Sequence, residues 1–175
     1  MVACLLALLA AALIARQTHP KVLAHGGERY RTHLRDRATA HGVGDLVEFD
    51  PTYLEANALA DLVGRADVVP LPYDSSQQVT SGVLVEALAA CGPVVTTVFP
   101  HAVELLAGGA GLLVPHRDPA AITAALRRVL TEPQLAAGMH DRSTELGPAL
   151  SWPAVAGRYL RLAEDLLTTR VVLTR

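Results

Sequence analysis

ADVVPLPYDSSQQVTSGVLVEALAACGPVVTT, residues 66–97, contains two short apolar runs separated by a polar segment and a helix-forming segment. The runs at 66–71 and 93–97 are rich in β-branched residues and predict buried strands. Residues 74–81 are polar and turn-prone, and residues 83–90 favour a helix. Two strands joined through one helix make a parallel βαβ unit, so this stretch predicts an α/β fold.

The loop before the predicted helix is where such a unit binds a ligand, because ligands lie past the carboxyl ends of parallel strands. The loop enters the helix through four residues, Thr80, Ser81, Gly82 and Val83. The first amides of a helix have no partner within it, and a glycine lets an anion approach the backbone. We therefore expect a phosphate group to bind at this place.

Glu86 lies one helical turn after Gly82, on the same face if the helix begins near that glycine. A carboxylate there can accept hydrogen bonds from a ribose diol, as carboxylates do in other nucleotide sites. The spacing fits a capping or solvated glutamate equally well.

These residues resemble the donor-domain signature of retaining GT-B glycosyltransferases, of the glycosyl transferase group 1 or family-four type. In that signature a glutamate, seven residues and a second glutamate run from the loop into the helix. Glu86 matches the second glutamate, which contacts the ribose in the family, and Gln78 takes the place of the first, which contacts the donor sugar. The resemblance covers about residues 17–167 and includes Pro93-Val94-Val95, Glu104-Leu105-Leu106, Gly111-Leu112-Leu113-Val114-Pro115, Asp118-Pro119 and Ser151-Trp152.

The resemblance implies a Rossmann-like parallel sheet flanked by helices, the C-terminal half of a GT-B fold. Residues 1–16 would be an apolar remnant, 17–150 the donor-binding domain, and 151–175 a crossover helix and tail. The Gly-Arg strand and Lys-Gly loop that open the donor domain in the family have no match here. We therefore expect an N-terminally truncated chain that lacks its first, central strand.

The activity implied is transfer of a hexose from a nucleotide-diphosphate sugar to a hydroxyl acceptor with retention, without an essential metal or other cofactor. Gln78 and Glu86 would be the catalytic residues. The substrate-binding residues would be Thr80, Ser81, Gly82, Val83 and Glu86. Two histidines are further candidates: His19, in a Thr-His-Pro turn that resembles one in some relatives, and His101, just past the predicted strand at 93–97. The more frequent reading of such a histidine is an ordinary loop residue. Gln78 is neutral, so it cannot supply negative charge beside a developing oxocarbenium ion.

Other functions remain open. The chain could be a non-catalytic nucleotide-binding module, or a donor subunit completed by a partner chain that carries an acceptor domain. A nucleotide-sugar epimerase of the same fold is a further alternative, and a secreted binding protein would require cleavage of the apolar N-terminus. The acceptor, the base and the sugar are not indicated by the sequence.

Composition agrees with one domain that has a substantial core, since 51% of the 175 residues are hydrophobic. A net charge of −2 gives no broad basic surface for nucleic acid. Glu28 and Asp36 are interleaved with the arginines at positions 29, 31, 35 and 37, which predicts a solvated helix face. The seven histidines show no metal-ligand spacing.

The apolar run at residues 2–15 is too short to cross a membrane unaided and has no basic segment before it. We expect a helix over 2–9 and a strand over 11–15. Cys4 and Cys91 lie in apolar surroundings, which favours free thiols in a reducing compartment. We therefore expect a cytoplasmic protein. A membrane surface stays open as a partner, but no feature of the sequence points to one.

The rest of the chain alternates helices and strands. Helices are expected over 28–41 and 54–64, a strand over 46–49, and a helix capped by Asp118. Pro133 and Gly147-Pro148 predict loops.

Cys91 replaces a glycine that usually ends the signature helix, so Gly92 is expected to take the left-handed position. The last helix carries an apolar stripe formed by Val155, Tyr159, Leu162 and Leu166.

Overall fold

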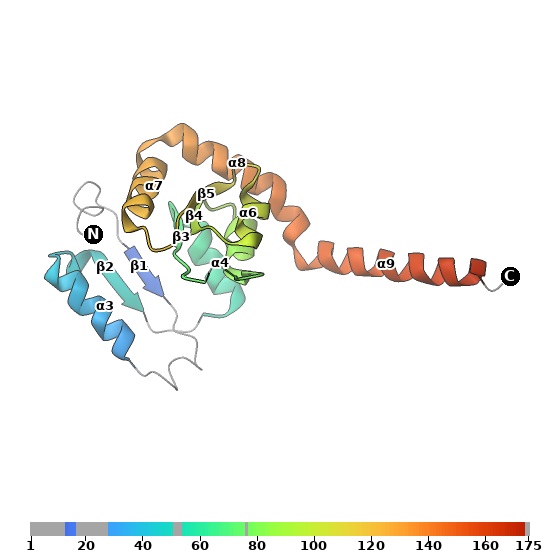
Figure 1. Cartoon of the computed structure of the whole chain (residues 1–175), viewed down its shortest axis with the longest axis horizontal. Helices are drawn as coiled ribbons and strands as arrows, with labels where there is room; N and C mark the ends of the chain where they lie inside the picture. The colour runs from blue at the N-terminus through green and yellow to red at the C-terminus, as the bar shows by residue number, and fades with distance from the viewer. Residues whose placement is uncertain (1–12, 17–27, 51–53, 76, 174–175) are drawn as a thin grey trace.

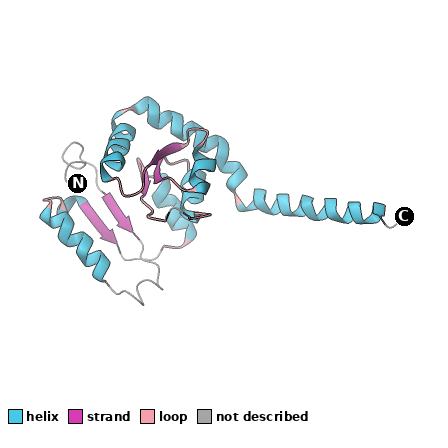
Figure 2. Cartoon of the chain, viewed as in Figure 1, coloured by secondary structure: helices cyan, strands magenta, loops and turns pink. Residues whose placement is uncertain are grey.

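The computed structural model describes residues 13–16, 28–50, 54–75 and 77–173. The predicted helix over residues 2–9, Cys4 and His19 lie outside this part of the chain. Helices and parallel strands alternate along the described residues (Figure 1 and Figure 2). The predicted α/β fold with a parallel sheet flanked by helices is therefore confirmed.

A three-stranded parallel sheet lies at the centre of the larger part of the fold (Figure 1). Its strands, in spatial order, are β3 (Val69–Leu71), β4 (Val94–Thr97) and β5 (Gly111–Val114). All residues of the middle strand are buried, in agreement with its β-branched sequence. Both strands of the predicted βαβ unit are present, and the first is shorter than expected.

Both faces of this sheet are covered by helices. Neighbouring residues of a strand point to opposite faces, so two consecutive residues of the middle strand belong to different clusters. Val94 joins one buried cluster and Val95 joins the other. The first cluster packs against α4 (Ala56–Gly64), α5 (Gly82–Ala89) and α6 (Pro100–Leu106). The second packs against α7 (Pro119–Thr131) and the beginning of α8 (Pro133–Leu150).

A second parallel sheet pairs β1 (Leu13–Arg16) with β2 (Val47–Asp50). It lies beside α3 (Arg29–Ala40), which is followed by the short 3₁₀ helix η1 (Gly44–Leu46). Among the described residues, no strand pairs this sheet with the three-stranded one. The expected lack of a central strand therefore remains a prediction.

One arginine of α3 is not solvated as the sequence predicted. Arg31 is buried, and its guanidinium lies 2.7 Å from the carboxylate of Glu28. The two residues are three positions apart, so they lie on the same side of the helix. Charge alternation alone did not distinguish this arginine from its exposed neighbours.

The C-terminus of α5 is closed by Cys91 and not by the expected glycine. The backbone of Cys91 has a φ of 60°, in the left-handed region. Its amide donates to the carbonyl of Leu88, and the amide of Gly92 donates to the carbonyl of Ala87. These two bonds define a Schellman motif with Cys91 at the left-handed position. The prediction for Gly92 was wrong.

α8 passes without interruption through Gly147 and Pro148, where the sequence predicted a loop. A Cβ added to Gly147 would lie 3.6 Å from the Cα of Ala89, so the glycine lets α8 pack closely on α5. Pro133 is likewise not in a loop, because it occupies the first turn of α8. Tertiary packing of the helix overrides the turn signals here.

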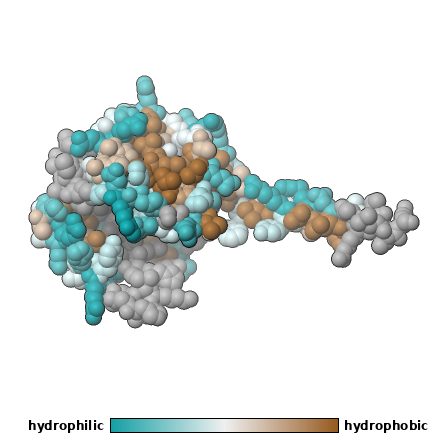
Figure 3. Space-filling model, in the orientation of Figure 1, coloured by the Kyte–Doolittle hydropathy of each residue, from teal (hydrophilic) through white to brown (hydrophobic). Residues whose placement is uncertain are grey.

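The last helix, α9 (Trp152–Leu173), projects away from the rest of the molecule (Figure 1). Its apolar side chains are largely exposed and form a stripe along one side in Figure 3. Tyr159, Leu162 and Leu166, which belong to the predicted stripe, are 54–71% exposed. Among the described residues, no helix is both long enough and apolar enough to cross a membrane.

Candidate functional site

The carboxyl ends of β3, β4 and β5 meet at one edge of the sheet, because the three strands are parallel. Three loops begin there: residues 72–81 after β3, residues 98–99 after β4 and residues 115–118 after β5. This is the edge at which open α/β sheets bind ligands. The first loop leads into α5, as the sequence predicted.

Ser81 organises the beginning of α5. It has an extended backbone, and its Oγ accepts a hydrogen bond from the amide of Leu84 at 3.1 Å. The hydroxyl of Tyr73 lies 3.0 Å from the same Oγ. Ser81 is therefore a well-anchored N-cap, and the residue is 4% exposed.

The backbone amide of Ser81 is not free, which corrects part of the predicted site. It donates to Nδ1 of His101 at 3.2 Å. Among the described residues, the amides of Gly82 and Val83 have no partner. Of the amides of Ser81, Gly82 and Val83, those of Gly82 and Val83 are thus open to an anion.

The surface above Gly82 is open. A Cβ added to Gly82 would meet no described atom within 4 Å, and Val83 is 39% exposed. Glu86 lies one turn further along α5, is exposed, and forms no hydrogen bond or ion pair among the described residues. The predicted arrangement of a bare helix start with a carboxylate one turn away is therefore present. The role of that carboxylate remains a prediction.

Gln78 and Thr80 belong to the loop that precedes α5. The Nε2 of Gln78 donates to the carbonyl of Thr80 at 3.1 Å, so the glutamine stiffens its own loop. Gln78 is half-buried and Thr80 is exposed. The structure therefore brings Gln78, Ser81 and His101 to the same edge, while His19 lies outside the described residues.

Sequence reasoning missed Tyr73. Its ring packs edge-on against Phe99, with centroids 5.6 Å apart, and its carbonyl accepts a bond from Oγ1 of Thr97 at 2.8 Å. The residue follows a strand-ending proline, which marks a loop but does not reveal what the loop contacts. The contact of its hydroxyl with Ser81 links Tyr73 to the start of α5.

An ion pair joins two of the three loops. The guanidinium of Arg117 donates to the carboxylate of Asp74 through Nε at 2.8 Å and Nη2 at 3.0 Å. These bonds lower the pKa of Asp74 below its ordinary value of 3.8. Arg117 has a φ of 55°, a left-handed conformation that is unfavourable for a side chain with a Cβ.

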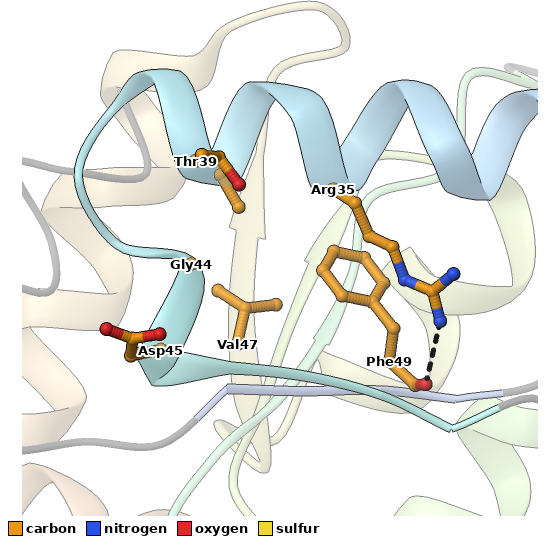
Figure 4. A pocket seen from close by; sticks show the side chains of 7 residues that line it. Arg35, Thr39, Gly44, Asp45, Val47 and Phe49 are labelled. Carbon is orange, nitrogen blue, oxygen red and sulfur yellow. Dashed lines mark hydrogen bonds between the residues drawn. The ribbon is translucent and has the colours of Figure 1, made fainter.

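A hollow of about 330 Å³ lies elsewhere, between α3 and β2 (Figure 4). The guanidinium of Arg35 lies over the ring of Phe49, at 5.6 Å from its centroid, and donates to the carbonyl of Phe49 at 3.5 Å. Thr39, Gly44 and Asp45 line the other side. None of the predicted site residues lines this hollow, so we do not assign the candidate site to it.

Within the described residues, no three histidine, cysteine, aspartate or glutamate side chains are grouped so that they could hold a metal ion. Cys91 is a free thiol and half-buried.

Several solved structures share this fold. Sucrose-phosphate synthase from Thermosynechococcus elongatus is 23% identical, with a TM-score of 0.75 over 96% of this chain and 42% of its own. HepE from Anabaena, solved in complex with UDP-glucose, is 20% identical, with a TM-score of 0.69 over 82% of this chain and 38% of its own. The chain thus spans less than half the length of either protein.

A third similar structure is the C-terminal domain of LpcC, a glycosyl transferase group 1 family protein from Francisella tularensis. It is 16% identical, with a TM-score of 0.68 over 83% of this chain and 72% of its own. No curated protein matches the sequence. The family model for glycosyl transferases group 1 matches residues 3–132, which is more than half of the chain. The chain therefore belongs to the glycosyl transferases group 1 family and has the fold of GT-B glycosyltransferases.

Proposed function

We propose that this chain is the donor-binding part of a glycosyltransferase that moves a hexose from a nucleoside-diphosphate sugar to a hydroxyl acceptor, with retention of configuration. The observation that carries the proposal is the open start of α5. There the amides of Gly82 and Val83 have no partner among the described residues, in a chain of this family.

In this proposal the diphosphate binds the amides of Gly82 and Val83. Each amide can donate one hydrogen bond, and the positive end of the helix dipole adds a favourable field. As the sugar leaves, negative charge grows on the diphosphate, so the same fixed donors stabilise the transition state. Thr80 adds a hydroxyl at the exposed rim of the site.

His101 supplies a further donor. Its Nδ1 accepts the amide of Ser81, so the neutral ring carries its proton on Nε2. We propose that this Nε2–H donates to the nucleotide sugar. His19 would act at the same edge, as the family resemblance implies.

Glu86 and Gln78 divide recognition of the sugars. The carboxylate of Glu86 accepts hydrogen bonds from the ribose diol, and the amide of Gln78 binds hydroxyls of the transferred hexose. Because Gln78 is neutral, stabilisation of the oxocarbenium ion comes from the leaving diphosphate and not from this residue. We propose no metal or other cofactor for the reaction.

A second candidate is a nucleotide-binding module without activity of its own, or a donor subunit completed by a partner chain. The observation that favours it is the exposure of the candidate site, since Gly82, Val83 and Glu86 all face solvent. Acceptor recognition has no assigned residue in this chain. We therefore expect weak or absent transfer by the chain alone.

Calorimetric titration with UDP, GDP and ADP tests the proposal. We expect one of them to bind the 175-residue chain, and Glu86→Gln to weaken that binding about tenfold through loss of charged hydrogen bonds to the ribose. Glu164→Gln, at an exposed glutamate on α9, is the matched control and should leave binding unchanged. If none of the three nucleotides binds, the proposal is wrong.

Turnover separates the two candidates. The chain is incubated with the nucleotide sugar of the base that binds, with and without a hydroxyl acceptor, and release of the diphosphate is followed. If the wild-type chain releases the diphosphate and Glu86→Ala does not, the chain is a complete transferase. Binding without release supports the module or the donor subunit.

A further inference from the structure

The turn between β5 and α7 contacts the loops that follow both other strands of the sheet. The Nδ1 of His116 lies 3.0 Å from the carbonyl oxygen of Tyr73, in the loop after β3. The Nε2 of the same ring is hydrogen-bonded to the carbonyl of Val98, in the loop after β4. One imidazole therefore joins all three loops at the edge where the nucleotide is proposed to bind.

Both partners of this ring are carbonyl oxygens, which can only accept hydrogen bonds. Neutral imidazole has one N–H and one bare nitrogen, so it can satisfy only one of the two contacts. Both contacts are satisfied together only when each ring nitrogen carries a proton. A side chain that keeps two N–H groups at this position, such as arginine, can satisfy both contacts at once.

The next residue strengthens the same connection. Arg117 binds Asp74 with two hydrogen bonds, so two consecutive residues of one loop hold two consecutive residues, Tyr73 and Asp74, of the other. Arg117 adopts its left-handed φ of 55° at this point. An unfavourable conformation of this kind persists where surrounding contacts hold it, and it is frequent at functional sites.

The contacts continue from Tyr73 to the start of α5. The carbonyl of Tyr73 also accepts a bond from Thr97, so its position is set from two sides. Its hydroxyl reaches Oγ of Ser81, and that Oγ caps α5 by accepting the amide of Leu84. His116 is thus connected to the first turn of α5 through Tyr73 and Ser81, without reaching the turn itself.

We propose that His116 is a positioning residue for the nucleotide site: by contacting both carbonyls it holds the loops after β3 and β4 together and so keeps Tyr73 against Ser81. This inference rests on the proposed function. When the ring is removed, the loop that carries Tyr73 loses part of its anchoring. Nucleotide affinity then falls.

The experiment measures calorimetric affinity for the nucleoside diphosphate that the chain binds. His116→Ala should bind it about tenfold more weakly than wild type. His116→Arg, which has several N–H donors for the same two carbonyls, should recover affinity. His33→Ala, at an exposed histidine of α3, is the control and should behave as wild type.

His116→Ala that binds with wild-type affinity overturns the proposal. So does His116→Arg that binds as weakly as His116→Ala. Failure of the wild-type chain to bind any nucleotide overturns the proposed function as well, whereas normal binding by His116→Ala overturns only the positioning role.

Discussion

The backbone amide of Ser81 donates a hydrogen bond to Nδ1 of His101, twenty residues further along the chain. This contact connects the N-cap of α5 with the first turn of α6. It also decides the tautomer, since a neutral ring that accepts at Nδ1 carries its proton at Nε2. His101 is therefore a hydrogen-bond donor toward any ligand at this edge and not a base through Nε2.

Substitution of His101 can separate its two contacts. In His101→Asn the side-chain oxygen takes the place of Nδ1 as acceptor, while the Nε2–H donor is lost. We expect near-normal stability with weaker nucleotide binding. His101→Ala also leaves the amide of Ser81 without an acceptor, so it should lose about 1 kcal/mol of unfolding free energy as well. Denaturant unfolding and calorimetry measure the two effects, and equal behaviour of the two variants would contradict the assigned tautomer.

Gly82→Ala tests where the diphosphate lies. The added Cβ meets no described atom within 4 Å, so the fold should be unchanged or slightly more stable. The methyl group would nevertheless occupy the space beside the free amides, and we expect at least about a tenfold loss of nucleotide affinity. Gly138→Ala, in α8 and equally uncrowded, is the matched control. Normal binding by Gly82→Ala would place the diphosphate elsewhere.

Cys91→Gly should stabilise the protein. The left-handed backbone of Cys91 costs about 1–2 kcal/mol for a residue with a Cβ, and a glycine has no such cost. Glycine also increases the entropy of the unfolded chain, so a net gain of about 0.5–1 kcal/mol is expected. Equilibrium unfolding in urea measures this change in the free energy of unfolding. Gly109→Ala, at a φ of 90° with open space around it, is the control and should change stability in the opposite direction.

The Asp74–Arg117 ion pair predicts that the stability of the fold decreases at acid pH. The pKa of Asp74 is lower in the folded chain than its ordinary value of 3.8, because Arg117 donates to the carboxylate. The pair therefore stabilises the fold above pH 3.8, and this contribution disappears as the pH falls through the lowered pKa. NMR titration of the Asp74 carboxyl should show its midpoint rising in Arg117→Gln. Arg127→Gln, at an exposed arginine of α7, should leave the midpoint unchanged.

Local features of the sequence were sufficient where the cause is local. The cap of α7 is an example, since Asp118 accepts the amide of Ala121 at 2.9 Å and Pro119 occupies the first turn. The buried β4 and the bounds of α5 also follow from composition and periodicity within a few residues. Each of these signals lies within about one turn or one strand of its effect, so no knowledge of distant segments is needed.

The same local rules failed where a distant segment decides the outcome. Gly147-Pro148 has the composition of a loop, yet it continues α8 because Gly147 packs against Ala89 of α5. Gly92 looked like the natural left-handed residue, but the bonds that close α5 place Cys91 there.

By itself, the sequence determined the α/β class, the helix that starts at a bare glycine, and the carboxylate of Glu86 one turn later, because these follow from the order and spacing of neighbouring residues. Only the tertiary structure decided which groups at that edge remain free. The amide of Ser81 is taken by His101, twenty positions away, and Tyr73 is held by His116, 43 positions away. Contacts over such separations arise when parallel strands bring their carboxyl ends together, and no local pattern specifies them.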